Sequence, residues 1–169
     1  MKRIAAVLAL LAATVTGGDA LAAAGQGNNE LGFSGNLIIP HDADLTILIL
    51  NGRFGRYFTD EILVGGRVTY VGFDGDGADG KMIDVVAEGR YHFLTQEVVI
   101  PYAGALAGLT LLDVVGETNI GVTMGAFGGA KHYISENTSV FAEYVLTMSY
   151  VDSDTQTVSA INFGISFLF

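Results

Sequence analysis

Arginine and carboxylate side chains recur inside apolar segments of this chain, where an unpaired charge would be unfavourable. The basic members are Arg53, Arg67 and Arg90, and the acidic members are Asp84, Glu88 and Glu143. A guanidinium can bind a carboxylate through two parallel hydrogen bonds, and a buried charge without a partner costs several kcal/mol. The set therefore predicts an interior ion-pair network that neutralises itself, in which Glu143 pairs with one of the arginines. A gate for solutes, built from the same charges, is the alternative.

The histidines raise the question of catalysis. His132, Ser135 and Glu143 are the residue types of a nucleophilic triad, in which a base activates a hydroxyl and an acid orients the base. His41 and His92 have no partners in a pattern typical of a triad or a metal site. Ordinary structural histidines explain all three positions, so we expect no catalytic residue and no cofactor.

A glycine-rich segment over 74–80 contains three regularly spaced carboxylates. Asp74, Asp76 and Asp79 have a spacing similar to that of a calcium loop. The segment lacks the bidentate Glu that completes an EF-hand loop, so a solvated turn explains it as well. We therefore predict no resident metal and keep these three residues as weak candidates.

The segments that carry these residues alternate between apolar and polar positions with a period of two, which is typical of β-strands. The clearest are 62–71, 82–93, 140–150 and 161–169, and weaker matches at 30–39, 45–58, 98–110 and 119–133 bring the number to eight. In the last segment, one face carries Ile161, Phe163, Ile165, Phe167 and Phe169. Segments 45–58 and 98–110 are partly apolar on both faces, so the alternation leaves their inward residues open.

The composition of the polar faces decides between a soluble sandwich and a membrane barrel. Lys, Glu and Thr would be expected where a sandwich meets water, whereas these faces consist of Gly, Ser, Thr, Asn and a few isolated charges. Such residues suit the narrow, packed interior of an eight-stranded barrel, whose strands cross the hydrocarbon in about 9–11 residues. The chain is therefore predicted to be all-β, an eight-stranded antiparallel transmembrane β-barrel in which closure leaves no free strand edge.

The N-terminus has the three parts of a Sec signal peptide. Met1-Lys2-Arg3 is basic, Ile4 to Val15 is apolar, and Ala20-Leu21-Ala22-Ala23-Ala24 supplies small residues for cleavage after Ala22 or nearby. We expect residues 1–24 to be the signal peptide and residues 25–169 to be the barrel. Without Lys2, Arg3 and Asp19, 6 basic and 17 acidic residues remain, a net charge of −11 that excludes a nucleic-acid partner.

With a periplasmic N-terminus, the connections near 40–44, 72–81, 111–118 and 152–156 would face outward. These outer segments contain nine acidic residues and only Lys81 as a base; besides the three candidates above they hold Asp42, Asp44, Asp113, Glu117, Asp152 and Asp154. Divalent cations shared with lipopolysaccharide phosphates would fit this charge. Aromatic residues gather near the expected ends of the strands, as interfacial girdles require; those near the periplasmic end are Tyr57, Phe58, Tyr91, Phe93, Tyr133, Phe141 and Phe169.

The whole mature chain resembles the small outer-membrane β-barrel superfamily that includes opacity-type and OmpA-like transmembrane barrels. The resemblance rests on the signal peptide, on Phe54-Gly55-Arg56-Tyr57-Phe58-Thr59-Asp60, on Pro101-Tyr102-Ala103-Gly104-Ala105 and on Ile161 to Phe169. It implies a monomer in the outer membrane of a Gram-negative bacterium, surrounded by lipids and lipopolysaccharide. The C-terminal strand is similar to the signal that such proteins present to the barrel-assembly machinery after export by the Sec translocon.

The resemblance implies a structural, envelope-integrity or surface-interaction role without catalysis. The outer loops are short compared with those of adhesive members, which weakens an adhesive role. Passage of small solutes through a narrow, porin-like pore is the alternative. A lipid A-modifying enzyme is a further one, because lipid A deacylases of this barrel class use a His/Ser/acid set. However, His132 and Ser135 would lie at the periplasmic end, lipid A occupies the outer leaflet, and the flanking residues do not match.

Overall fold

The computed structural model describes residues 25–38, 45–75, 80–93, 99–114, 117–151 and 154–169. The expected signal peptide over 1–24 lies outside these residues and stays a prediction. Eight strands follow one another along the chain: β1 (Asn29–Ile38), β2 (Leu45–Tyr57), β3 (Ile62–Gly75), β4 (Gly80–His92), β5 (Val99–Val114), β6 (Glu117–Ser135), β7 (Thr138–Val151) and β8 (Asp154–Leu168). No helix within the described residues is long and apolar enough to cross a membrane.

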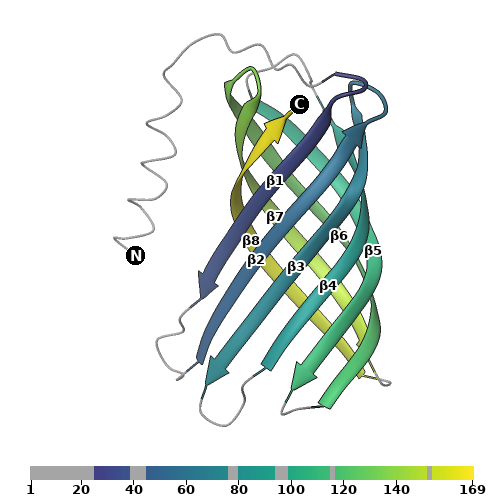
Figure 1. The fold of residues 1–169 in the computed structure, drawn as a ribbon, viewed down its shortest axis with the longest axis vertical. Helices are drawn as coiled ribbons and strands as arrows, with labels where there is room; N and C mark the ends of the chain where they lie inside the picture. The colour runs from purple at the N-terminus through teal and green to yellow at the C-terminus, as the bar shows by residue number, and fades with distance from the viewer. Residues whose placement is uncertain (1–24, 39–44, 76–79, 94–98, 115–116, 152–153) are drawn as a thin grey trace.

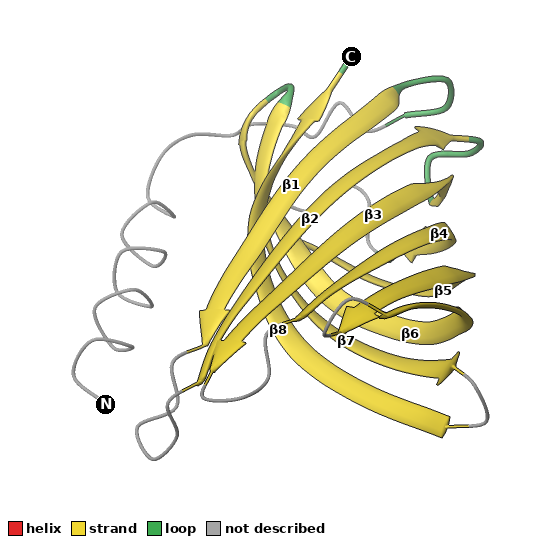
Figure 2. Cartoon of the chain, turned by 60° about the horizontal axis from the view of Figure 1, so that its bottom comes forward, coloured by secondary structure: helices red, strands yellow, loops and turns green. Residues whose placement is uncertain are grey.

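Each strand pairs with its neighbours in the chain, and β1 pairs with β8 to close the sheet (Figure 1). All pairs are antiparallel. Figure 2 shows the strands wrapped around one interior, strongly tilted to its axis. The predicted eight-stranded antiparallel barrel is therefore confirmed, and every strand has a partner on both sides.

Several strands continue beyond the ends that the alternation predicts. β3 extends to Gly75, and β4 begins at Gly80, inside a segment expected to be an outer loop. Gly72 pairs with Lys81, and Asp113 pairs with Lys81 from the other side. Polar residues can extend a hairpin, because strands pair through backbone hydrogen bonds whatever their side chains are. The alternation of apolar and polar residues, by contrast, would stop where the strands leave the membrane.

The two faces of the strands separate large apolar residues from polar ones. Phe33, Phe54, Val85 and Tyr144 are examples of outward side chains that are about half exposed. Inward positions hold charged residues, hydroxyls and glycines, together with two buried apolar clusters. These clusters explain why segments 45–58 and 98–110 looked apolar on both faces: Tyr57, Ile100 and Leu106 point into the barrel.

The expected aromatic girdle at the periplasmic end is only partly correct. Phe58, Tyr91, Phe93 and Phe169 are exposed on the outside. Tyr57, Tyr133 and Phe141 are instead buried inside the barrel. They share the inward parity of their strands, and the interior of a small barrel needs large side chains to fill it.

Inward glycines allow neighbouring strands to approach closely. Gly65 of β3 pairs with Gly55 of β2, and a Cβ atom on Gly65 would collide with the Phe54 carbonyl oxygen and with the Gly55 backbone. Gly52 is the control position for Gly65. It lies on the outward face of β2, and a Cβ atom added there would meet no atom within 4 Å.

We expect Gly65→Ala to lower the free energy of unfolding by about 1–3 kcal/mol, because the backbone must shift to admit the methyl group. Gly52→Ala should leave it unchanged or raise it slightly. Urea unfolding of both variants, followed by circular dichroism, checks the difference. Equal midpoints for the two variants would show that the interior is not closely packed at Gly65.

Candidate functional site

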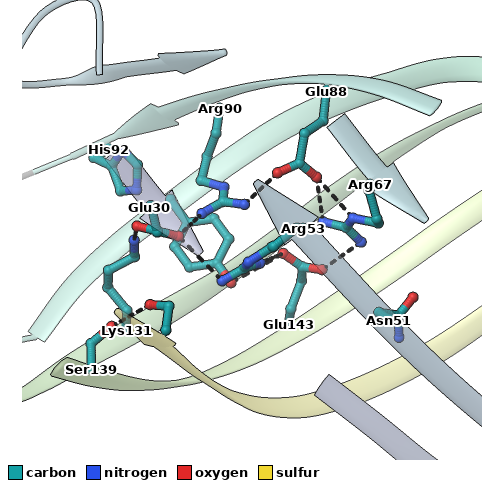
Figure 3. A network of polar contacts seen from close by, with 12 residues as sticks. Glu30, Asn51, Arg53, Arg67, Glu88, Arg90, His92, Lys131, Ser139 and Glu143 are labelled. Atoms are coloured by element: carbon teal, nitrogen blue, oxygen red, sulfur yellow. Dashed lines mark hydrogen bonds and ion pairs between the residues drawn. The ribbon is translucent and has the colours of Figure 1, made fainter. Parts of the chain in front are cut away.

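A continuous network of charged side chains crosses the barrel interior (Figure 3). It joins side chains from six strands: Glu30 of β1, Arg53 of β2, Arg67 of β3, Glu88 and Arg90 of β4, Lys131 of β6 and Glu143 of β7. All seven are buried, with at most 5% of each residue exposed. We refer to these seven residues as the charged network.

Glu30 contacts three of the four cations. Its Oε1 lies 2.8 Å from Nη1 of Arg90 and 3.6 Å from Nη2 of Arg53. Its Oε2 accepts hydrogen bonds from the Lys131 ammonium and from the Tyr57 hydroxyl. One carboxylate therefore joins β1 to β2, β4 and β6 across the interior.

Glu88 and Glu143 connect the arginines to one another. Glu88 lies 2.8 Å from Nη2 of Arg67 through Oε2 and 2.6 Å from Nη2 of Arg90 through Oε1. Glu143 lies 2.8 Å from Nη1 of Arg67 and 3.2 Å from Nη1 of Arg53. The Glu143 pairing with an arginine, which the sequence led us to expect, is thus present with two of them.

Aromatic side chains provide further contacts for the cations. The guanidinium carbon of Arg53 lies 3.7 Å from the centre of the Phe141 ring, and that of Arg67 lies 4.8 Å from the centre of the Phe127 ring. The Tyr102 hydroxyl donates a hydrogen bond to Glu143. A cation above an aromatic face is stabilised by the ring quadrupole, most strongly where water is excluded. Phe141 and Tyr102 therefore hold the charges as well as filling space.

Two clusters of buried apolar side chains pack against the charged network. One cluster is at the end where β2, β6 and β8 finish, and it consists of Tyr57, Leu63, Ile100, Tyr133 and Leu168. The other cluster consists of Val86, Tyr102, Leu106, Phe127 and Val145. The interior around the charged network is thus filled by packed side chains.

The structure brings together five of the six residues that the sequence proposes for the network. Asp84 also points inward, but it accepts a hydrogen bond from Thr110 and forms no ion pair with the described residues. Glu30 and Lys131 take part although the sequence reasoning did not include them. Glu30 is the first residue of the segment 30–39, on the face opposite Leu31 and Phe33, so an assignment of that second face would have found it. Lys131 was harder to find, because the outward residues around it are small and the alternation between apolar and polar side chains is weak there.

The sequence predicts a network of three cations and three carboxylates, which would neutralise itself. The observed network does not. It contains four cations and three carboxylates, a net charge of +1. Asp84 balances this charge within the interior as a whole, at a separate position. Each of the seven charges has at least one partner of opposite sign, and ion pairs of this kind can hold strands in register.

The histidines of the described residues do not come together with Ser135 and Glu143. Lys131 and Tyr133 are buried in the interior, so His132 between them faces outward, whereas Glu143 faces inward. Ser135 is exposed at the end of β6. His92 packs inside, where its ring nitrogens lie 3.1 Å from the Glu61 carbonyl oxygen and 3.4 Å from the Tyr57 hydroxyl. His41 lies outside the described residues.

Those of the remaining candidates that the structure describes lie at an end of the barrel or on its outside. Asp74 is exposed on β3 opposite Thr46, while Asp76 and Asp79 lie outside the described residues. Among the residues that the structure does describe, no group of three or more potential ligands could hold a metal. The residues of the expected assembly signal are all on the outward face of β8 or at the chain end: Ile161, Phe163, Ile165, Phe167 and Phe169.

No protein-family model matches the chain, and no curated protein matches it. Neisserial surface protein A superimposes with a TM-score of 0.66 at 16% identity, over 84% of this chain and 96% of that one. The N-terminal β-barrel domain of Pseudomonas aeruginosa OprF gives a TM-score of 0.53 at 22% identity, over 86% and 99%.

A third solved structure is that of the Yersinia pestis outer membrane protein Ail in a phospholipid bilayer nanodisc. It superimposes with a TM-score of 0.54 at 19% identity, over 86% of this chain and 99% of Ail. In all three comparisons almost the whole of the other chain is matched, so the similarity covers the complete barrel. The chain therefore has the fold of the small eight-stranded outer-membrane barrels, the class that its sequence resembles.

Proposed function

We propose that this chain is an integral outer-membrane protein that acts as a structural element of the Gram-negative envelope, without catalysis or transport. The observation that carries the proposal is the charged network, which links six strands across the interior and is packed against two clusters of apolar side chains. Such an interior favours a rigid, closed scaffold over a pore, because an aqueous path needs a continuous polar lumen.

The outside of the barrel supports a membrane location. Large apolar residues such as Phe33, Phe54, Leu109, Val122 and Ile161 are exposed around the barrel. A surface of this kind would cause association in water, whereas hydrocarbon solvates it. The proposal includes lipids and lipopolysaccharide as the surroundings of a monomer, and the barrel-assembly machinery as the partner that recognises β8 together with Phe169.

A closed interior predicts that the reconstituted protein conducts no ions. In planar bilayers at 1 M KCl, discrete conductance steps should be absent, because side chains of the charged network and of both apolar clusters occupy the path. A 16-stranded porin, which has an aqueous channel, serves as the positive control. Insertion of the chain is verified by the altered gel mobility of the unheated, folded barrel. Reproducible conductance steps from inserted protein would contradict the scaffold role and support passage of small solutes.

The envelope role has its own test in the source bacterium. Deletion of the coding sequence should increase entry of a large hydrophobic dye that an intact outer membrane excludes, and expression of the unaltered chain should restore exclusion. Lipid A from both strains should have the same mass. Unchanged dye entry would contradict the structural role, and a mass difference that depends on the chain would support a lipid A-modifying enzyme instead.

A further inference from the structure

A small cavity lies in the interior, on the side of the charged network that faces away from Phe169. Its apolar wall includes Ile49, Val71, Met82, Val86 and Leu106, and its polar groups include Asn51, Asp84 and Asn162. The volume of about 50 Å³ accommodates a molecule of the size of roughly three to five waters. An apolar wall with a few convergent polar groups is typical of a small-ligand site.

Asp84 is the interior carboxylate that the charged network leaves out. Only 6% of the residue is exposed, and no basic side chain of the described residues lies within ion-pair distance of it. Arg67 also borders the cavity, but its guanidinium is engaged by Glu88 and Glu143. A carboxylate in such surroundings favours a cationic partner, because its own hydration is reduced.

A chain of hydroxyl groups holds one oxygen of Asp84. Thr110 donates a hydrogen bond to Oδ1 at 2.6 Å. A hydroxyl has a single proton, so Thr110 must accept the bond that it shares with Thr123, and Thr123 must in turn accept from Ser149. All three protons point toward the carboxylate, and such aligned bonds strengthen one another. No side chain of the described residues binds the second oxygen, Oδ2.

Two buried amides that border the same cavity have unused hydrogen-bonding atoms. Asn51 accepts a hydrogen bond from Thr69 through Oδ1, but its Nδ2 has no partner in the described part of the chain. Oδ1 of Asn162 likewise has none. The two residues are 7% and 3% exposed. Buried polar atoms without partners cost free energy, so both amides favour a bound group that satisfies them.

We propose that this cavity binds a small primary ammonium ion with a short apolar tail. Oδ2 of Asp84 is an acceptor for the ammonium protons, and the apolar wall around Met82 and Val86 receives the tail. Oδ1 of Asn162 becomes a second acceptor, and Asn51 Nδ2 a donor for a ligand that also has a hydroxyl group, once these buried amides turn toward the cavity. This inference concerns ligand binding and goes beyond the proposed envelope role.

Nuclear magnetic resonance of the methyl-labelled barrel in a phospholipid nanodisc tests the site. Ethylammonium chloride is titrated at pH 7 against the methyl signals of Met82, Val86 and Leu106. We expect saturable shifts of these signals. Ethanol, which has the same size without the charge, and acetate, which has the opposite charge, should cause none, and potassium chloride corrects for ionic strength.

Asp84→Asn should weaken ethylammonium binding roughly tenfold or more, since it removes the charge from a charge-assisted hydrogen bond. The amide can still accept the Thr110 hydrogen bond, so the methyl spectrum should remain that of a folded barrel. Asp113→Asn is the matched control, because Asp113 is partly exposed at the barrel rim and pairs with Lys81. It should bind as the unaltered chain does.

Several outcomes would overturn the proposal. Absence of saturable shifts in the unaltered protein excludes the site, and equal shifts with ethanol show that the charge is irrelevant. Potassium ions that produce the same shifts would identify an inorganic cation site instead. Undiminished binding in a folded Asp84→Asn barrel would exclude the carboxylate. Where that variant fails to fold, the comparison of ethylammonium with ethanol on the unaltered chain still decides.

Discussion

Glu30→Gln is expected to lower the free energy of unfolding of the barrel by about 3–5 kcal/mol, the range observed when one partner of a buried ion pair is removed. Glu30 contacts Arg53, Arg90 and Lys131, so its loss leaves four cations against two carboxylates in the charged network. The glutamine keeps the size of the side chain, and the effect therefore reports charge. Urea unfolding in detergent micelles or nanodiscs, followed by circular dichroism, measures it.

A second substitution separates charge balance from the loss of particular contacts. Lys131→Met removes one cation and leaves three cations and three carboxylates, so its own cost should be well below that of Glu30→Gln. Combined with Glu30→Gln, it restores the original net charge of the network. We expect the double variant to be more stable than Glu30→Gln alone. A double variant whose loss equals the sum of the two single losses would show that the excess charge is not what destabilises the interior.

Glu143→Ala is expected to cost a similar amount, about 3–5 kcal/mol, because it leaves Arg53 and Arg67 without a shared carboxylate. It also removes the acceptor of the Tyr102 hydroxyl and opens space between β7 and the other strands of the network. The unfolding midpoint in urea should fall, while the slope of the transition should remain close to that of the unaltered chain if the barrel stays two-state.

Glu136→Ala is the matched control for Glu143→Ala. Glu136 lies in the exposed turn between β6 and β7, seven residues before Glu143 in the chain. Its removal changes the same side-chain chemistry at the surface, where substitutions usually alter stability by less than about 0.5 kcal/mol. An unchanged midpoint for Glu143→Ala, or equal losses for both variants, would mean that the charged network does not stabilise the barrel.

The amino-acid sequence alone determined the architecture, because side-chain direction in a strand follows a local period of two. That period and the polarity of the inward faces were enough to predict an eight-stranded barrel with Arg53, Arg67, Arg90, Asp84, Glu88 and Glu143 inside. It was also enough to place Phe163 and Phe167 outside. The alternation was least informative in 45–58 and 98–110, where apolar side chains fill the interior.

Only the tertiary structure decided which inward charges meet. Asp84 and Glu88 share a face of β4, but four residues of an extended strand span about 13 Å. Glu88 therefore lies level with Arg67 and Arg90, whereas Asp84 lies beside a cavity and a chain of hydroxyls. Glu30 and Lys131 are 101 residues apart and meet because strand tilt and closure set their heights across the barrel. Those heights depend on the register of all eight strands, which no local pattern contains.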